Sequence, residues 1–445
     1  MSTCDERSVQ NALRPEGQLE DQVVPDHQGA VEPQDVLDSQ DTVGPQDAVG
    51  SHALKPPDTV EPQDDIEPQK VPELHTSLEL SSPRKVSSRF TKITSPSFTT
   101  SPLPFQLRSH PFPVTSVAVH PSNLSVVSGD EGGWVIWWNL TNRRPLLIFR
   151  PHNKALVTLQ WVSSTKLLTH ARDYKLKVFE LEPDMDFTQY NTKLPTQLDD
   201  GSGFRAPWVT NILDVNSLNF CNASAVGNRL ATSSTMDSEK FDVYEFEQGV
   251  LKRPFKAVAH EKQSDPVDPI KTGILMTLLL VDGDQLIAGY ESGHVMIFSL
   301  RTAGSAKPVY VNKCHGHPVL SVALDPTTYT FLSCSADSLV VKHNLSTLKE
   351  VAVLNTKHSG LNSISVRSDG RIFATAGWDG KIRVFDYRKM TPLAVLKSGE
   401  GGVTSVDFGN VLDILEHSTR QQKVASTHHL AVGAKNGRVL LYDLY

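Results

Sequence analysis

The 445-residue sequence contains few cysteines and no long apolar run. Its four cysteines form no C-x-x-C pair, so neither a disulfide framework nor a zinc site is expected, and reduced thiols are the default. The start, "MSTCDERSVQ", lacks the basic residues and the apolar run of a secretory signal. The longest aliphatic stretch, "ILMTLLLV" at Ile274 to Val281, has the length of a strand and falls short of the roughly 18 residues of a membrane span.

The sequence also lacks the local signatures of common enzymes. It contains no G-x-x-x-x-G-K-[ST] loop, no H-E-x-x-H helix and no G-x-S-x-G elbow. The pair His428 and His429 has no third metal ligand at a sensible spacing. We therefore expect no catalytic residue, no metal site and no cofactor.

Charge is divided unevenly along the chain. Residues 1–75 contain 17 acidic and 4 basic residues, a net charge of −13, whereas the remaining 370 residues contain 39 basic and 33 acidic residues, a net charge of +6. A small excess spread over so many residues differs from the concentrated basic face of a nucleic-acid-binding protein. We expect neither a nucleic-acid partner nor a membrane partner.

Residues 1–100 have the composition of a disordered tail. The phrases "VEPQD", "VGPQD", "VEPQD" and "IEPQK" recur, proline blocks helix formation, and aromatic residues are too scarce to offset the entropy of ordering. From Thr76 the tail becomes Ser-rich and locally basic, and Ser82, Ser95 and Ser101 each precede a proline. This part is a solvated linker or a phosphorylated regulatory or nuclear-targeting segment, and the sequence leaves both interpretations open.

Residues 101–445 repeat one pattern of alternating apolar strands, Gly-rich turns and a strand that ends in an aromatic residue. Seven such endings align, at Trp138, Phe179, Tyr244, Phe298, His343, Phe385 and Tyr442, with steps of 41, 65, 54, 45, 42 and 57 residues. Alternation with period two and a spacing of about 40 to 45 residues, lengthened by insertions, is typical of WD-repeat propellers, with four strands in each blade. The predicted fold is all-β, a seven-bladed WD-repeat β-propeller after a disordered tail.

A recurring histidine and a recurring turn residue predict a buried network in the blades. His110, His152, His315 and His358 each precede an apolar strand, and in WD repeats such a histidine bonds with a strand Ser or Thr, a turn Asp and the strand Trp. The turn position six residues before the aligned aromatic is occupied by Asp173, Asp337, Asp379 or Asn436 in four units and by Gly132, Ser238 or Ser292 in the others. We assign Asp173, Asp337 and Asp379 to structural hydrogen bonds.

The last unit has only three strands before the chain ends at Tyr445. A ring of sheets needs a completed last blade, because an open strand edge exposes unpaired backbone groups. The segment "LPFQLR" at Leu103 to Arg108 is the natural donor of the fourth strand. We therefore expect the two ends of the repeat region to close the ring.

Loop residues are the candidates for partner binding, because the loops of a propeller emerge on two flat faces. In the seven repeats, the residue just before the turn position is Glu131, Arg172, Asp237, Glu291, Ala336, Trp378 and Lys435, in chain order. Trp378 alone is large and aromatic in a turn that should face solvent, so it either contacts a partner or folds over its own blade. The candidate contact residues are Trp378, Arg172, Glu291 and Lys435.

At the level of whole phrases the sequence resembles ASTRA-associated protein 1, a fungal WD-repeat family related to animal guanine-nucleotide-binding-protein beta-like proteins. The phrases include "GGWVIWWNLTNRRPL", "PWVTNILDVNSLNFC" and "VRSDGRIFATAGWDGKIRVFDY" and cover roughly residues 108–445 but none of the tail. The resemblance implies a nuclear, non-enzymatic subunit of the chromatin-associated ASTRA complex, with RuvB-like AAA+ ATPases, telomere-length-regulation co-chaperones and kinase-related proteins as partners. It further implies roles in chromatin remodelling and in the stability and maturation of phosphatidylinositol-3-kinase-related kinases.

Two alternatives remain beside a scaffold with a monomeric ring. A heterotrimeric G-protein beta subunit would need an N-terminal coiled coil, and this tail is broken by prolines and has no heptads. A propeller hydrolase would need convergent carboxylates or a metal cluster, which the sequence does not place.

Overall fold

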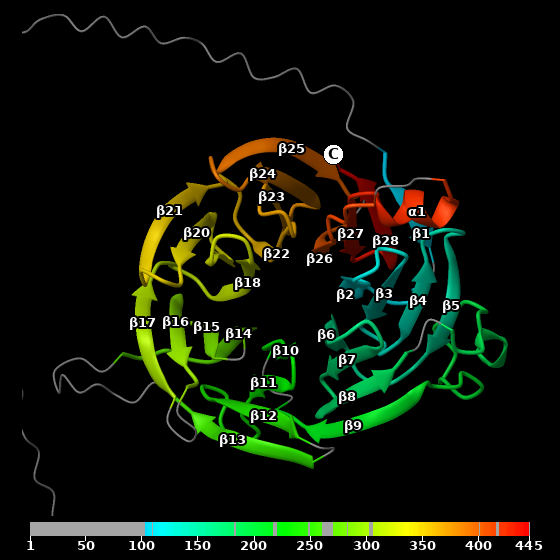
Figure 1. Cartoon of the computed structure of the whole chain (residues 1–445), viewed down its shortest axis with the longest axis horizontal. Helices are drawn as coiled ribbons and strands as arrows, with labels where there is room; N and C mark the ends of the chain where they lie inside the picture. The colour runs from blue at the N-terminus through cyan, green and yellow to red at the C-terminus, as the bar shows by residue number, and fades with distance from the viewer. Residues whose placement is uncertain are drawn as a thin grey trace, which may run out of the picture. The chain divides into compact units, whose positions relative to one another are not determined.

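The computed structural model describes residues 103–444, except 109, 182–183, 217–219, 248–249, 260–269, 283, 302–305, 400 and 415–417. The expected tail, with Ser82, Ser95 and Ser101, lies outside the described residues. The described chain forms seven four-stranded antiparallel sheets arranged in a ring (Figure 1). The predicted all-β, seven-bladed propeller is confirmed.

Each blade is a four-strand meander whose first strand lines the ring centre. The strands of blades 1 to 3 are β2 (Val114–Val119), β3 (Ser125–Asp130), β4 (Val135–Asn139), β5 (Arg144–Phe149), β6 (Leu156–Trp161), β7 (Lys166–Ala171), β8 (Lys175–Glu180), β9 (Trp208–Asp214), β10 (Ser224–Val226), β11 (Arg229–Ser233), β12 (Phe241–Glu247) and β13 (Val250–Val258). Those of blades 4 to 6 are β14 (Leu275–Val281), β15 (Gln285–Tyr290), β16 (His294–Ser299), β17 (Lys307–Lys313), β18 (Val319–Asp325), β19 (Thr330–Ser335), β20 (Leu339–Asn344), β21 (Lys349–Asn355), β22 (Leu361–Val366), β23 (Ile372–Gly377), β24 (Lys381–Asp386) and β25 (Thr391–Lys397).

Blade 7 is built from both ends of the described chain. It combines β26 (Val403–Phe408), β27 (His429–Ala434) and β28 (Arg438–Asp443) with β1 (Phe105–Arg108), which pairs antiparallel with β28. Leu107 of β1 is buried against Val439 and Trp134 in the core between blades 7 and 1. The expected closure of the ring by the segment at Leu103 to Arg108 is confirmed.

The hydrophobic core lies between the blades, because each twisted sheet packs on the next. Seven clusters of buried side chains account for the seven interfaces between neighbouring blades in the described chain. Phe241 of blade 3 and Phe298 of blade 4, for example, meet edge to face with ring centroids 4.9 Å apart. Alternation along each strand therefore places one row of side chains against each neighbour.

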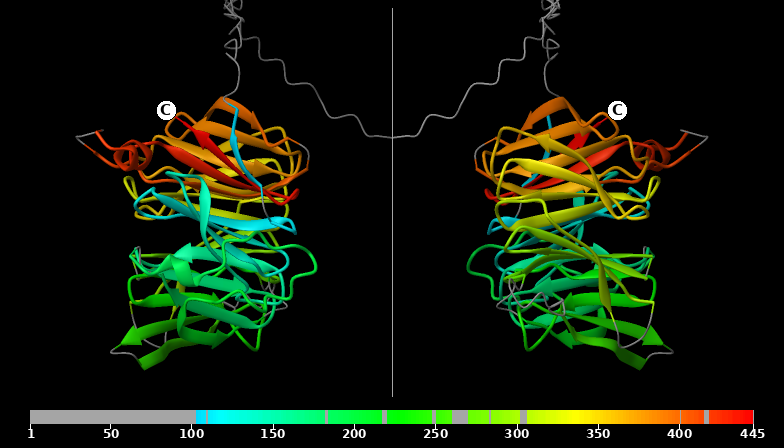
Figure 2. Two further views of the ribbon diagram at one scale, coloured as in Figure 1. Left: turned by 90° about the vertical axis from the view of Figure 1, so that its right-hand side faces the viewer. Right: turned by 90° about the vertical axis from the view of Figure 1, so that its left-hand side faces the viewer.

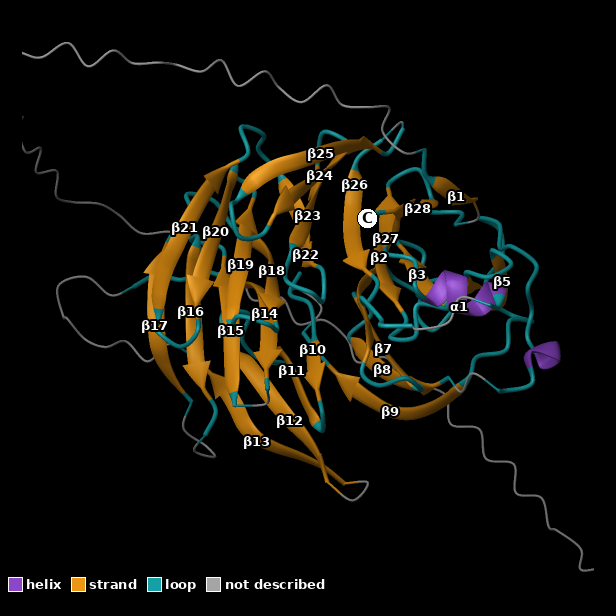
Figure 3. Cartoon of the chain, turned by 45° about the horizontal axis from the view of Figure 1, so that its top comes forward, coloured by secondary structure: helices purple, strands orange, loops and turns teal. Residues whose placement is uncertain are grey.

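Loops emerge on two faces. Connections between blades and turns between second and third strands lie on one face, here the upper face, and the remaining turns lie on the lower face. The short helix α1 (Arg420–Ala425) belongs to the lower face, since it connects β26 to β27, and Figure 2 shows its segment projecting from the ring. The connection between β8 and β9 contains the 3-10 helix η1 (Phe187–Gln189) and extends along blade 1 (Figure 3). It is held there by the Ile148 amide, which donates to the Asn191 carbonyl.

Candidate protein-interaction face

A complete buried hydrogen-bond chain holds the upper side of blade 1. The Trp138 indole N–H donates to Ser128 Oγ at 2.8 Å, and Ser128 Oγ lies 2.7 Å from His110 Nε2. His110 Nδ1 lies 3.0 Å from Asp130 Oδ2, so each group donates to the next only if the histidine proton is on Nδ1. The sequence pattern had not singled out Asp130, because this carboxylate lies two positions before the aligned turn residue Gly132.

Blades 2 and 5 contain variants of the same network. His152 Nδ1 lies 3.0 Å from Asp173 and its Nε2 lies 2.8 Å from Thr169 Oγ1, and burial lowers the pKa of His152. In blade 5 His315 lies between Asp337 and Ser333. His343 there takes the place of the strand tryptophan, with Nε2 at 3.0 Å from Ser333 Oγ and Nδ1 at 3.1 Å from the Tyr310 hydroxyl.

A neutral His343 satisfies both contacts, with Nδ1 accepting from the Tyr310 hydroxyl and Nε2 donating to Ser333 Oγ. Burial lowers the pKa of His343 to about 3, which keeps the ring neutral. The alignment of this histidine with six aromatic residues therefore has a physical basis, since a neutral imidazole supplies the N–H that an indole supplies in blade 1.

Blade 6 departs from the expected network. Arg383 from β24 donates to both carboxylate oxygens of Asp379, with Nη1 at 3.1 Å from Oδ1 and Nη2 at 2.6 Å from Oδ2. Asp379 thus makes hydrogen bonds inside its blade, but His358 is exposed and its ring makes no hydrogen bond in the described chain. The prediction that His358 belongs to the buried network is wrong, because Arg383 on the third strand, and not His358, binds Asp379.

In blade 6 the loop that carries His358 packs under the Trp378 ring. Gly360 has φ +83°, and a Cβ at this position would lie 2.4 Å from the Trp378 ring, so the indole packs directly on backbone that only glycine allows. The Trp378 amide donates to the Gly360 carbonyl at 2.9 Å, and the indole N–H lies 3.4 Å from Asn362 Oδ1. Trp378 is still 53% exposed, so it is fixed on its own blade and presented to solvent at the same time.

The four candidate contact residues occupy the same turn on four different blades. Arg172 lies over the Phe220 ring, 4.0 Å from its centroid, and Glu291 accepts a hydrogen bond from the Ile274 amide at 3.1 Å. Lys435 is exposed on blade 7, next to blade 6. Only Trp378 and Lys435 come from neighbouring blades. Their common neighbour is Gly402, whose Cβ would lie 3.3 Å from Lys435 Cε and 3.5 Å from the Trp378 carbonyl oxygen.

The first strands line a central cavity of about 410 Å³. Hydrogen bonds of 3.0 to 3.4 Å join its wall across blades, each from a backbone amide in or just before one first strand to a side-chain oxygen in or just before the preceding first strand. The oxygens belong to Ser116, Thr158, Asn222, Ser321, Ser363 and Ser405. Polar residues on these strands therefore stabilise the ring, and Phe220 and Asn362 add to the lining.

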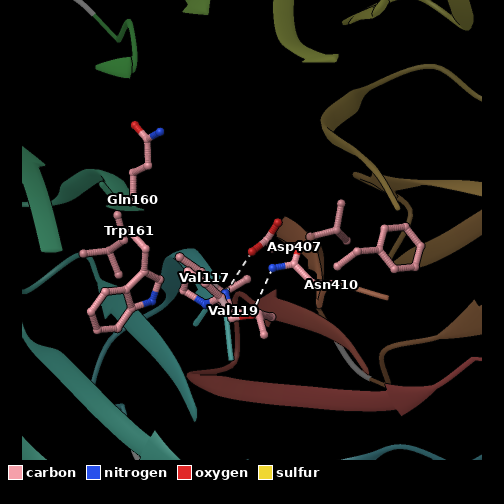
Figure 4. Close-up of a pocket in the computed structure, with 11 residues that line it drawn as sticks. Val117, Val119, Gln160, Trp161, Asp407 and Asn410 are labelled. Carbon is pink, nitrogen blue, oxygen red and sulfur yellow. Dashed lines mark hydrogen bonds between the residues drawn. The ribbon is translucent and has the colours of Figure 1, made fainter. Parts of the chain in front are cut away.

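A second cavity, of about 310 Å³, lies where blade 7 meets blades 1 and 2 (Figure 4). Asp407 Oδ2 accepts a hydrogen bond from the Val119 amide at 2.8 Å across the closure of the ring. Burial raises the pKa of Asp407 to about 7, and among the described lining residues it is the only titratable one. Trp161 lines the same cavity, and its indole nitrogen has no hydrogen-bond partner among the described residues.

Side-chain chemistry elsewhere is sparse in the part of the chain that the structure covers. No group of three or more His, Cys, Asp or Glu residues there could hold a metal ion. None of the described helices is long and apolar enough to cross a membrane. Burial raises the pKa of Cys314 to about 12, which leaves this thiol protonated and unreactive.

Sequence reasoning missed Arg383, Gly360 and Asn362. A signal for the first existed in "KIRVFDY", where an arginine occupies an inward position of an otherwise apolar strand. The roles of Gly360 and Asn362 carry no such signal, because they depend on how the loop before β22 lies against the turn after β23.

The seven blades and their buried His–Asp networks define a WD-repeat propeller in which polar side chains hold the loops in place. Comparison with known proteins identifies the family. The family model of ASTRA-associated protein 1 matches residues 103–423. The chain is 33% identical over 407 residues to ASTRA-associated protein 1 of Yarrowia lipolytica, covering 76% of this chain and 93% of that protein. It is 32% identical over 363 residues to the Schizosaccharomyces pombe protein, covering 72% and 97%. The chain belongs to the ASTRA-associated protein 1 family.

A solved structure supports the fold alone. The β-propeller domain of Cps50 (Swd1) from Myceliophteria thermophila superposes with a TM-score of 0.54 at 16% sequence identity, covering 77% of this chain and 98% of that domain.

Proposed function

We propose that this chain is a non-enzymatic interaction subunit of the ASTRA complex in the nucleus. Its partners would be RuvB-like AAA+ ATPases, telomere-length-regulation co-chaperones and kinase-related proteins, and its roles chromatin remodelling and the maturation of phosphatidylinositol-3-kinase-related kinases. Family membership supports the assembly.

The observation that carries the proposal is the state of the buried polar residues. His110, His152 and His315 bond to the turn carboxylates Asp130, Asp173 and Asp337 inside blades 1, 2 and 5, so these six groups hold the turns in place. The upper face presents to solvent the fixed ring of Trp378, other exposed apolar side chains such as Tyr174 and Met236, and scattered charges, which is the composition of an interaction surface. Arg172, Glu291, Trp378 and Lys435 are the proposed contact residues.

Affinity purification of the tagged full chain at low salt, followed by mass spectrometry, tests the assembly. We expect RuvB-like ATPases and kinase co-chaperones to be recovered. Recovery of a small gamma-type subunit instead would replace the proposal with a G-protein beta-like role. Incubation of the purified chain with ATP and with generic ester and phosphate substrates tests the absence of catalysis, and turnover above a heat-inactivated sample would contradict it.

The contribution of the upper face is tested with paired variants in the same purification. Glu291→Lys and Lys435→Glu reverse exposed charges on the upper face, whereas Lys349→Glu reverses an exposed charge on the outer strand β21. We expect subunit recovery to fall with the first two and to stay unchanged with the third. The opposite pattern would place the interface on the rim of the ring.

A further inference from the structure

We propose that Trp378, Lys381, Lys397 and Lys435 form a docking surface for an acidic peptide segment that carries an aromatic residue. These four residues are called the Trp378 patch. The inference rests on the proposed function, because it names the chemistry of one partner for the same upper face.

The aromatic part of the patch is prearranged. Trp378 is held by its own amide, by its indole nitrogen and by the flat backbone of Gly360 beneath the ring. The side chain of Asn362 in turn donates to the Thr404 carbonyl of blade 7, and the Thr404 hydroxyl donates to the Val114 carbonyl of blade 1 at 2.6 Å. Little rotamer entropy is therefore lost when a partner covers the ring, which is the property of a strong anchor.

No lysine or arginine of the described chain lies over the Trp378 ring. Six aromatic rings there have a lysine or arginine over their face, and Trp378 is not among them. With 53% of Trp378 exposed, its indole is available to an aromatic ring of a partner, which would gain from stacking beyond the burial of area.

The surroundings of the ring are basic. Lys381 and Lys397 are directly opposite partners on β24 and β25, where like charges are unfavourable, and Asp379 Oδ2 at 3.9 Å from Lys381 Nζ offsets only part of this repulsion. Lys435 reaches the same patch from blade 7 through its contact with Gly402. Loops 355–361, 377–383, 397–403 and 434–438 contain two acidic residues, Asp379 and Glu400; Glu400 lies outside the described residues, and Arg383 holds both oxygens of Asp379.

The extent of the patch favours a peptide over a nucleic acid. The lysines of the patch belong to blades 6 and 7. Elsewhere the same face carries other exposed lysines, such as Lys154, and the exposed acidic residues Glu131 on blade 1 and Glu291 on blade 4. A continuous phosphate backbone would meet these carboxylates as it crossed the face, whereas a short acidic segment would not. The patch therefore fits two or three carboxylates around one ring.

Fluorescence anisotropy of the full chain with a labelled probe tests the inference. The probe is a peptide of about ten residues, roughly 33 Å when extended, in which Glu alternates with Ser around one central Phe. We expect Trp378→Ala and Lys435→Glu each to weaken binding on the order of tenfold or more. Trp208→Ala, which removes a tryptophan that is 77% exposed on β9, and Lys349→Glu should bind as the unchanged chain does.

A double-mutant cycle identifies the stacking contact. Replacing the central Phe of the probe by Ser should weaken binding to the unchanged chain and should have no further effect on Trp378→Ala. The inference is overturned if the unchanged chain does not bind the probe, if Trp208→Ala and Lys349→Glu lose as much affinity as the patch variants, or if an oligothymidylate of the same length binds more tightly. Recovery of ASTRA subunits in those cases would leave the proposed function standing and remove only this docking surface.

Discussion

Arg383 donates hydrogen bonds to both carboxylate oxygens of Asp379, and this pair does in blade 6 what a histidine does in blades 1, 2 and 5. The hydrogen bonds from Arg383 hold the pKa of Asp379 below its usual value. Because Arg383 pairs with Asp379, His358 is not part of the buried network and lies at the surface. The loop before β22 packs under Trp378.

Replacing Arg383 by Met should lower the free energy of unfolding by about 2 to 4 kcal/mol, because Arg383 is only 5% exposed and Asp379 loses two of its hydrogen bonds. A lowered folded pKa stabilises above the unfolded pKa of the carboxyl and is lost as the pH falls through the folded value. The loss caused by Arg383→Met should therefore be largest at neutral pH and shrink in acid. Urea unfolding at several pH values checks this, and a loss independent of pH would contradict it.

Ser128 and Thr375 occupy matching positions on the second strands of blades 1 and 6. The Ser128 hydroxyl joins Trp138 to His110, whereas the Thr375 hydroxyl has no hydrogen-bond partner in the part of the chain that the structure describes. Ser128→Ala should cost about 2 to 3 kcal/mol, because it orphans two buried groups, and Thr375→Val should change stability by less than about 0.5 kcal/mol or increase it. Similar losses in the two variants by chemical denaturation would mean that the network contributes nothing.

Closure of the ring predicts that the segment before His110 is essential for stability. Deletion of residues 101–109 removes β1, exposes the edge of β28 and uncovers the core around Leu107, so the protein should become insoluble or lose several degrees of melting temperature. An unchanged melting temperature would refute the closure.

A point substitution separates the core contact from the strand pairing. Leu107→Ala, at 3% exposure, should cost about 2 to 5 kcal/mol. Leu103→Ala, at 95% exposure in the same segment, is the matched control and should be neutral within about 0.5 kcal/mol.

The raised pKa of Asp407 predicts that stability depends on pH with the opposite sign to the dependence predicted for Asp379. Its folded pKa of about 7 is higher than that of an unfolded aspartate, so folding binds a proton, and the contribution of Asp407 to stability falls as the pH rises from about 4 to about 7. Asp407→Asn keeps an acceptor for the Val119 amide without a charge. The variant should therefore gain stability over the unchanged chain above pH 7, a gain absent near pH 4, as measured by thermal melts across this range.

Gly360 and Trp378 should be coupled energetically. Gly360→Ala places a methyl group against the indole and forces alanine to φ +83°, so it should cost more than the roughly 1 to 2 kcal/mol of the left-handed backbone alone. In a Trp378→Ala background the steric part disappears and only the backbone part should remain. Equal costs in the two backgrounds would show that the indole does not rest on Gly360.

The repeat pattern predicted the number of blades and the closing strand because both follow from local alternation and from the requirement to pair every strand edge. His110, His152 and His315 were also recognisable, since each precedes a first strand at a regular distance. His358 fits the same spacing and yet lies in solvent. Spacing cannot report that Arg383 reaches Asp379 from another strand.

The sequence by itself determined the fold, because period-two alternation, turn residues and the open edge of the last blade permit one closed arrangement. Only the tertiary structure decided which polar groups meet. It joined Trp378 to Gly360 and Asn362, brought Lys435 beside them from the next blade, and buried Asp407 at the junction of the first and last blades. Such contacts depend on the packing of segments far apart in the chain, where differences of an ångström decide whether a hydrogen bond forms.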